Sequence, residues 1–396
     1  FYLLTMYCAV RAHASRHAGW WWGGVLTACA LGLGTKQVMG TAPLMVGLYY
    51  WTFFPGALSG PGRRRAWLVG LGLAWLAACV AVALASAHAT AGFGVKGVTP
   101  WNYALTQSQV LWHYLRLAVA PAELCLDYAW PVAKGLGEVW PWVFLTLVLL
   151  ALTTWGCARR KAWGFAGAWF FVVLAPTSSF IPIADVAVEH RMYLPLASVV
   201  IAAVVGAYLA GKWMLESLPR PVPRFLGLFA ACALSAATAA ALACATVVRN
   251  RDYRSAQAIW EDTVAKRPYN PRAHTNLATI LTGVGRVSEA LSHARRAVEI
   301  DPNLAEAHSN LGNVLVDAGK AEEALECYRK ALELRPGFAE ALSNQGHALV
   351  KLGRFEEARL CFEKALEWKP DYTEAHANLA VVLEKLNRHA EAREHE

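Results

Sequence analysis

Four prolines recur at one fixed interval near the C-terminal end of the sequence. Pro268, Pro302, Pro336 and Pro370 share a constant 34-residue spacing. This period is typical of helix-turn-helix repeats, which bury their apolar faces against neighbouring units. The spacing therefore predicts an α-helical solenoid over this part of the chain.

Other residues keep the same 34-residue register. Small residues recur where two helices are expected to touch, and turn residues recur between the helices. A half-unit is also expected upstream, because Ala256 and Trp260 stand one full period before Ala290 and Ala294. We therefore predict a half-repeat junction at 249-270, followed over 271-396 by three full repeats and a truncated fourth. The recurring residues are Ala290, Ala324 and Ala358; Ala297, Ala331 and Ala365; Leu277, Leu311 and Leu379; Asn276, Asn310, Asn344 and Asn378; Gly285, Gly319, Gly353 and Asn387; and Cys327 and Cys361.

The chain before the repeats has a different composition. The whole sequence is 56% hydrophobic, yet 44 of its 66 Lys, Arg, Asp and Glu residues lie in 249-396. Apolar runs of about 20 residues are long enough to cross a membrane as helices. We therefore predict a polytopic membrane domain over 1-248 with about eight spans, near 1-10, 20-34, 38-55, 66-88, 139-157, 163-181, 192-211 and 225-248.

Basic residues mark one side of these expected spans. Alternate loops carry Arg11 and Arg16; Arg63, Arg64 and Arg65; Arg159, Arg160 and Lys161; and Lys212, Arg220 and Arg224. Only Glu216 opposes them, whereas the charges of the other loops cancel. By the positive-inside rule the basic loops are cytoplasmic, which places the repeats on the periplasmic or other non-cytoplasmic side. The formal charge of +8 is then a topology signal, and no nucleic-acid partner is expected.

The nine cysteines show no CxxC pair and no Cys/His spacing typical of metal ligands. Neither a disulfide framework nor a zinc site is indicated, and no divalent metal or other cofactor is expected. Cys327 and Cys361 are interpreted as packed core residues because they share one repeat position.

A cluster of ionisable residues lies at the outer end of an expected span, in FIPIADVAVEHRMYLPL at 180-196. The planar guanidinium of Arg191 could bind a phosphate beside His190, with Glu189 or Asp185 as a base or as the partner that holds the arginine. The alternative is a salt-bridge cluster that anchors a helix end.

Further candidates lie elsewhere on the same outer side. Lys36 would either reach the membrane interface or bind an anionic headgroup. Arg116, Glu123, Asp127 and Tyr128 could line an outer-loop cavity, or each could be a solvated loop residue. An amphipathic stretch near 105-120 predicts either an interfacial helix or an ordinary packing helix.

Several stretches match a known family: TKQVMGTAPLMVGLYYWTF, GVTPWNYALTQ, HYLRLAVAPAELCLDYAWPVA and GAWFFVVLAPTSSFIPIADVAVEHRMYLP, followed by the repeats. The chain resembles bacterial relatives of the transmembrane and tetratricopeptide repeat proteins, whose eukaryotic members are O-mannosyltransferases. The resemblance implies a GT-C type glycosyltransferase in the bacterial inner membrane. Its donor would be a sugar on a polyprenyl phosphate, and its repeats would recruit a protein or peptide acceptor.

The resemblance assigns the donor phosphate to Arg191, Lys36 and His190. It places the acidic catalytic loop upstream of Phe1, so that the fragment by itself is expected to be inactive. Gln37, Tyr50 and Trp51 replace the acids expected around Lys36 and at the end of the next helix. Two alternatives therefore stay open: a membrane-anchored scaffold of tetratricopeptide repeats without catalytic activity, and a polysaccharide ligase.

Overall fold

The protein is all-helical in the part of the chain that the structure describes. The computed structural model describes residues 1–33, 37–54, 56, 98–119, 124–176, 178, 187, 192–216, 246–251 and 253–395, with a few separate positions between 233 and 244. Within these ranges every regular element is a helix, which confirms the predicted all-α class. The chain divides into two compact units, Phe1–Leu124 with Trp130–Ala233, and Cys125–Ala129 with Leu234–Glu396.

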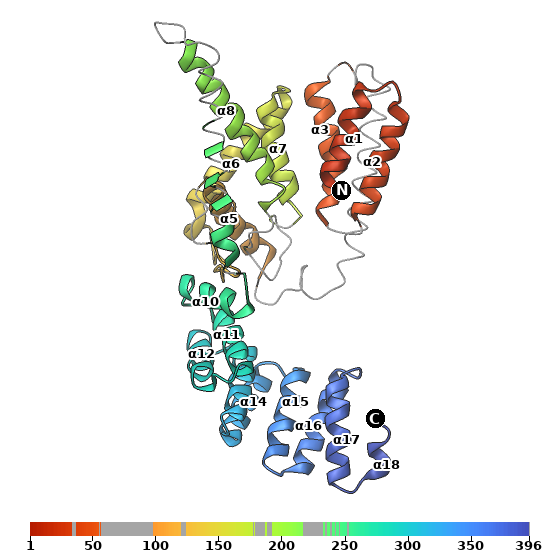
Figure 1. The fold of residues 1–396 in the computed structure, drawn as a ribbon, viewed down its shortest axis with the longest axis vertical. Coiled ribbons are helices and arrows are strands. Elements are labelled where there is room, and N and C mark those ends of the chain that lie inside the picture. The colour runs from red at the N-terminus through yellow and green to blue at the C-terminus, as the bar shows by residue number, and fades with distance from the viewer. Residues whose placement is uncertain are drawn as a thin grey trace. The chain divides into compact units, whose positions relative to one another are not determined.

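The first unit contains a bundle around its N-terminal helices, drawn in red and orange in Figure 1. Tyr2 packs edge-on against Trp169 with 5.4 Å between ring centroids, and the Tyr50 hydroxyl donates to the carbonyl of Ala9 at 2.9 Å. These contacts join helices that are distant in sequence into one apolar core, which also contains Met45. The described helices of this unit are α1 (Tyr2–Ala14), α2 (Ala18–Leu33), the 3-10 turn η1 (Gln37–Thr41), α3 (Ala42–Phe53), α5 (Pro100–Val119), α6 (Leu136–Ala158), α7 (Ala162–Leu174) and α8 (Leu196–Glu216).

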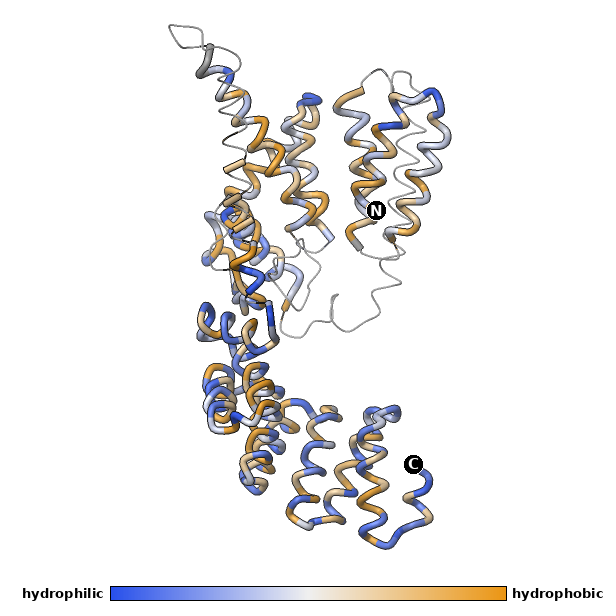
Figure 2. Tube along the Cα trace, in the orientation of Figure 1, coloured by the Kyte–Doolittle hydropathy of each residue, from blue (hydrophilic) through white to orange (hydrophobic). Residues whose placement is uncertain are grey.

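Two described helices, α6 and α8, are long and apolar enough to cross a membrane. Many of their large apolar side chains are exposed. Figure 2 shows the orange, hydrophobic stretches of the chain to which these helices belong. At 23 residues α6 is about 34 Å long, close to the thickness of a bilayer core. The exposed apolar residues are Leu136, Trp140, Trp142, Phe144, Leu145, Leu147, Val148, Leu152 and Trp155 on α6, and Val200, Ile201, Val204, Val205, Tyr208, Leu209 and Trp213 on α8.

The prediction of eight spans is not supported. Helices α3 and α7 contain 12 and 13 residues, which makes them about 18–20 Å long and shorter than a bilayer core of about 30 Å. These stretches are apolar as expected, but turns cut them short. The segment expected at 66-88 and more than half of the segment expected at 225-248 lie outside the described residues.

Glycines bring α6 and α7 close together. A Cβ atom on Gly156 would overlap the Trp163 ring, and one on Gly164 would overlap the backbone of Gly156 and Cys157. Small residues at such a crossing let two helical backbones approach. The hairpin of α6 and α7 therefore packs through main chain and one indole ring.

The second unit is a series of helical hairpins. The Oδ1 atom of Asn270 accepts the N–H of Ala273 and caps the first full unit, in which Pro271 takes the first helical position. The alternating helices are α10 (Ala256–Lys266), α11 (Pro271–Gly283), α12 (Val287–Ile300), α13 (Ala305–Asp317), α14 (Ala321–Leu334), α15 (Ala339–Lys351), α16 (Phe355–Trp368), α17 (Thr373–Lys385) and α18 (His389–Ala392).

The recurring small and turn residues have the roles that the 34-residue register predicted. The six alanines of the two predicted contact positions are fully buried. A Cβ on Gly312 would lie 2.6 Å from the Tyr328 ring, and one on Gly346 would lie 2.8 Å from the Phe362 ring. In each of these two units an aromatic ring of the second helix thus packs directly on a glycine of the first helix. The predicted turn residues all have positive φ: Gly285 (79°), Gly319 (76°), Gly353 (72°) and Asn387 (63°).

Candidate functional site

Most of the predicted donor site lies outside the residues that the structure describes. Glu123, predicted as lining of an outer-loop cavity, is not described either. The same holds for Asp185, Glu189, His190, Arg191 and Lys36 of the donor site. Their proposed roles in phosphate binding and catalysis stay predictions.

Arg116 lies in the last turn of α5, where its side chain is exposed. The rest of α5 is a packing helix, because Leu111 and Tyr114 are buried and the Trp112 indole donates to Thr146 Oγ1 of α6 at 3.1 Å. Of the two interpretations of the amphipathic stretch near 105-120, the structure favours the packing helix over the interfacial one.

Asp127 and Tyr128 belong to the same compact unit as the repeats. The side-chain amide of Asn270 donates to the backbone oxygen of Asp127 at 3.1 Å, and the guanidinium of Arg272 lies 3.7 Å from the Asp127 carboxylate. The guanidinium of Arg267 lies 5.2 Å from the centre of the Tyr128 ring, a cation–π distance. Asp127 and Tyr128 were predicted to line an outer cavity. In the structure both lie next to residues at the start of the repeat array.

Charged residues on the second helices of the units form local pairs. Arg354 donates two hydrogen bonds of 2.6 Å to Glu357, and Arg286 and Arg388 bind Glu289 and Glu391 in the same way. These hydrogen bonds lower the pKa of each of the three carboxyl groups. Since the pairs are exposed, their contribution to stability is small.

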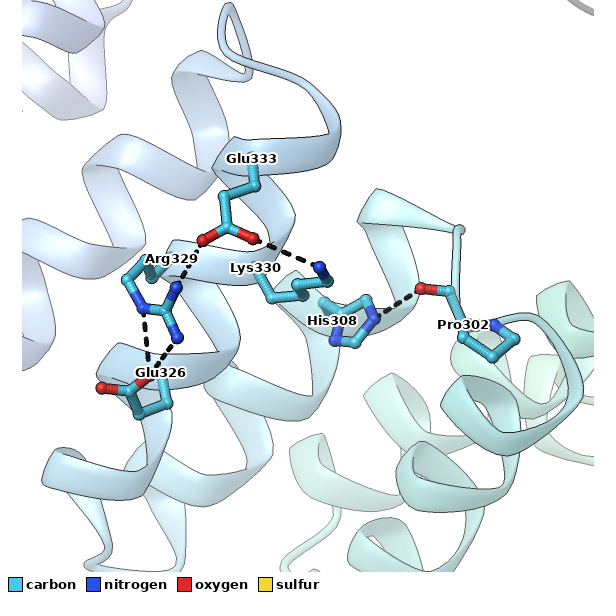
Figure 3. Close-up of polar contacts among 6 residues, drawn as sticks. All are labelled: Pro302, His308, Glu326, Arg329, Lys330 and Glu333. Atoms are coloured by element: carbon cyan, nitrogen blue, oxygen red, sulfur yellow. Dashed lines mark hydrogen bonds and ion pairs between the residues drawn. The ribbon is translucent and has the colours of Figure 1, made fainter.

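The unit that contains α14 shows the same pattern in close-up (Figure 3). Arg329 lies between Glu326 and Glu333, and Lys330 reaches Glu333 at 3.2 Å. His308 of α13 points away from these charges and binds the backbone oxygen of Pro302 at 2.9 Å. The recurring spacing of proline and histidine thus makes a contact between the start of a helix and the loop before it.

The half-buried asparagines of the register give the first helices a polar position. Asn276, Asn310, Asn344 and Asn378 occupy equivalent places in α11, α13, α15 and α17. The amide of Asn310 donates to Thr279 Oγ1 of the preceding unit at 2.5 Å. An amide side chain carries both donors and acceptors, which is the chemistry that an extended peptide backbone requires.

Two histidine pairs were missed by the interpretation of the sequence. His274 faces His293, and His376 faces His395, with ring centroids 5.2 and 5.1 Å apart. Burial lowers the pKa of both His274 and His293. The members of each pair are far apart along the chain, on the two arms of a hairpin, so only the fold brings them together. The shared 34-residue register was the signal that could have found them.

The two recurring cysteines are packed as predicted. Cys327 and Cys361 are half-buried, and burial raises the pKa of both thiols, to about 11 for Cys361. Both are therefore neutral thiols near pH 7.

Tetratricopeptide repeat models match three stretches of the chain, 246–305, 303–371 and 349–395. The second unit is thus an array of tetratricopeptide repeats, and its matched part begins in the helical residues 246–251 before α10.

Among curated proteins, the chain is 28% identical over 232 residues to the human protein O-mannosyl-transferase TMTC1. The match covers 54% of this chain and 25% of the human protein, so the chain spans about a quarter of the length of that relative. More than half of the chain is covered, whereas the repeat models together match only its last part, from 246 to 395, which is less than half. The similarity therefore extends beyond the repeats.

Several solved structures are similar to part of the chain. They include TTC0263 of Thermus thermophilus (22% identity, 38% of this chain and 83% of that one, TM-score 0.34) and MamA of Desulfovibrio magneticus (19%, 38% and 88%, 0.33). The first tetratricopeptide repeat domain of human RPAP3 is also similar (22%, 31% and 98%, 0.30).

Proposed function

We propose that this chain is part of a membrane glycosyltransferase. It would transfer a sugar from a polyprenyl-phosphate donor to a protein acceptor on the non-cytoplasmic side, with the repeats holding the acceptor. The observation that carries the proposal is the similarity to a human O-mannosyl-transferase, which covers more of the chain than the repeats do and therefore includes residues before them. The sugar, the acceptor and the side of the membrane are part of the proposal.

The outward-facing helices support the membrane component. Trp140 and Trp142 lie near the start of α6 and Trp155 near its end, all exposed, as tryptophans in the two interfaces of a bilayer would be. Arg159 and Lys161 follow the helix directly, so we assign its C-terminal end to the cytoplasmic side. The N-terminal end of α6 would then lie on the side of the transfer reaction.

Arg191, Lys36 and His190 are proposed to bind the donor phosphate. A lipid phosphate gains negative charge when the sugar leaves, and a guanidinium can stabilise that charge through two parallel hydrogen bonds. Asp185 or Glu189 would orient the arginine or accept the proton of the acceptor hydroxyl. Binding of the donor requires no metal ion in this scheme.

The test is transfer of labelled mannose from a polyprenyl phosphate to protein in membranes from cells that produce the complete protein, including the acidic loop expected upstream of Phe1. Arg191→Ala is expected to reduce transfer at least tenfold while the amount of protein in the membrane stays the same, because an unpaired phosphate charge costs more than about 1.4 kcal/mol. Arg295→Ala, at an exposed position of α12, is the matched control and should transfer normally. Equal activity of the two variants would refute the role of Arg191.

A second variant tests the role of the repeats. Replacement of Asn276, Asn310, Asn344 and Asn378 together by Ala should raise the acceptor concentration needed for half-maximal transfer and leave donor binding unchanged. An unchanged dependence on acceptor would exclude these amides from acceptor binding.

The scaffold is the second candidate, since the repeats are the part of the chain that family models match. It predicts that the wild-type protein retains bound partner proteins but transfers no sugar from any polyprenyl-phosphate donor.

A further inference from the structure

The first full repeat holds two imidazole rings in direct contact across its hairpin. His274 of α11 and His293 of α12 face each other with 3.0 Å between their Nδ1 atoms. The Nε2 atom of His274 lies 3.1 Å from the backbone oxygen of Pro268. Because a carbonyl can only accept, Nε2 carries a proton in this contact, and the Nδ1 atom of neutral His274 presents its lone pair to His293.

The fourth repeat contains the same arrangement. His376 of α17 and His395, which follows α18, have their Nδ1 atoms 2.9 Å apart, and His376 Nε2 lies 2.9 Å from the backbone oxygen of Pro370. The angle between the rings is 31° here and 33° in the first repeat. Two independent hairpins thus build one geometry from the same register positions.

This geometry is close to that of two imidazole ligands of one metal ion. Zn²⁺ binds imidazole nitrogens at about 2.0–2.1 Å with tetrahedral angles, which sets the two nitrogens about 3.3 Å apart. Each pair would have to open by only a few tenths of an ångström. An N–H bond to a backbone carbonyl on the far side of the ring is also how proteins orient a metal-binding histidine.

We propose that each histidine pair binds one divalent transition-metal ion of the zinc class through its two Nδ1 atoms. The shared proton on His293 Nδ1 leaves, and a proton enters at Nε2 of the same ring, so the ligand remains a neutral imidazole. Among the described residues no group of three or more His, Cys, Asp and Glu side chains could hold an ion, so water completes the coordination. The ion would link the two helices of one hairpin.

Solvent access favours binding at both places, whereas the nearby charge is mixed, because Arg296 acts on His274 and the carboxylates of Glu289 and Glu261 act on His293. His293, His376 and His395 are half-buried rather than sealed, so solvent reaches each pair. The carboxylate of Glu289 lies one helical turn before His293, and that of Glu391 one turn before His395. Each carboxylate interacts electrostatically with the histidine that follows it. Arg286 binds Glu289 and Arg388 binds Glu391, so neither carboxylate is a ligand of the proposed ion.

The middle repeats provide natural comparisons. The second repeat keeps His308 and its 2.9 Å contact to Pro302, but Cys327 stands where the partner histidine would be. The third repeat has Leu342 and Cys361 at the two positions. A single change, Cys327→His, would complete a third pair with His308, which its contact with Pro302 already orients.

The experiment measures Zn²⁺ bound to the full chain, purified in detergent at pH 7.5 without a polyhistidine tag, by equilibrium dialysis and metal analysis. His293→Asn and His395→Asn are each expected to bind one ion fewer than the wild type, and the double variant two fewer. Asparagine can still donate a hydrogen bond to the remaining Nδ1 atom, so the hairpin keeps its contact while the ligand is lost. His347→Gln, at an exposed position of α15, is the control and should bind as many ions as the wild type.

A variant that gains an ion is also needed, because a variant can lose ions simply by unfolding. Cys327→His should bind one ion more than the wild type, and Co²⁺ should then show stronger visible absorption from a site of low symmetry. The proposal is wrong if the double variant retains as many ions as the wild type, or if Cys327→His gains none. Circular dichroism of each variant should show unchanged helix content. These measurements do not depend on sugar transfer.

Discussion

Helices α6 and α16 both contain aromatic and aliphatic residues along their length, yet they use them in opposite ways. On α6 Phe144 is 59% exposed, whereas on α16 Phe362 is 1% exposed and covers Gly346. The apolar residues of α6 surround the helix, but those of the repeat helices recur on the faces that meet a neighbour. The same kinds of side chain are therefore exposed on α6, as the proposed membrane location requires, and used for contacts between helices in the repeats.

The largest expected effect tests that contrast at two phenylalanines. Phe362→Ala should lower the free energy of unfolding of the repeats by about 3–5 kcal/mol, because it removes a buried ring and leaves a cavity. Phe144→Ala should leave the unfolding of the repeats unchanged. Urea unfolding of the full chain in detergent, followed by circular dichroism, measures both. Equal effects would mean that the ring on α6 is buried by protein after all.

A charge placed on each surface sharpens the comparison. Leu147→Lys, in the middle of α6, should oppose membrane insertion by about 2.5–3.5 kcal/mol. Leu360→Lys, at an exposed position of α16, should have no effect on insertion. The fraction of protein that resists alkaline extraction from membranes is the measurement. If Leu147→Lys stays fully inserted, α6 does not face lipid.

Two glycines test the packing inside the repeats. Gly346→Ala should destabilise the array by about 1–3 kcal/mol, since its Cβ would lie 2.8 Å from carbons of the Phe362 ring. Gly283→Ala is the control, because no atom lies within 4 Å of the added Cβ. It should be neutral or slightly stabilising in the same urea titration. A comparable loss for both variants would count against the ring-over-glycine closure.

The smallest expected effect is a dependence of repeat stability on pH. Burial lowers the pKa of His274 and His293 below the ordinary value of 6.5, so the unfolded chain binds protons more readily than the folded one. Their contribution is present above pH 6.5 and is lost as the pH falls through the lowered values. The urea midpoint should therefore drop on acidification, and less so in the double variant His274→Gln, His293→Gln.

The repeats were predictable from sequence to the level of single residues. A turn that needs positive φ takes glycine or asparagine, and a close contact between helices takes alanine or glycine, so Gly319 and Ala324 reveal their roles by spacing alone. Local chemistry and a fixed period were sufficient here.

The first unit was less predictable, for physical reasons. Hydropathy measures composition, and α3 is apolar enough to span a membrane but contains only 12 residues, preceded by a 3-10 turn. Contacts between distant segments could not be predicted either, such as that of Tyr50 with Ala9, because no period connects these residues. The proposed donor site at Arg191 rests on a resemblance and awaits its test.

The turn residues have one more consequence, which concerns how such a chain can change over time. Each 34-residue unit begins and ends at the same point of the register, and Gly285, Gly319 and Gly353 mark identical bends. Recombination between any two units would add or delete whole hairpins without leaving an unmatched helix face. Tandem duplication can therefore lengthen the array by one whole hairpin at a time.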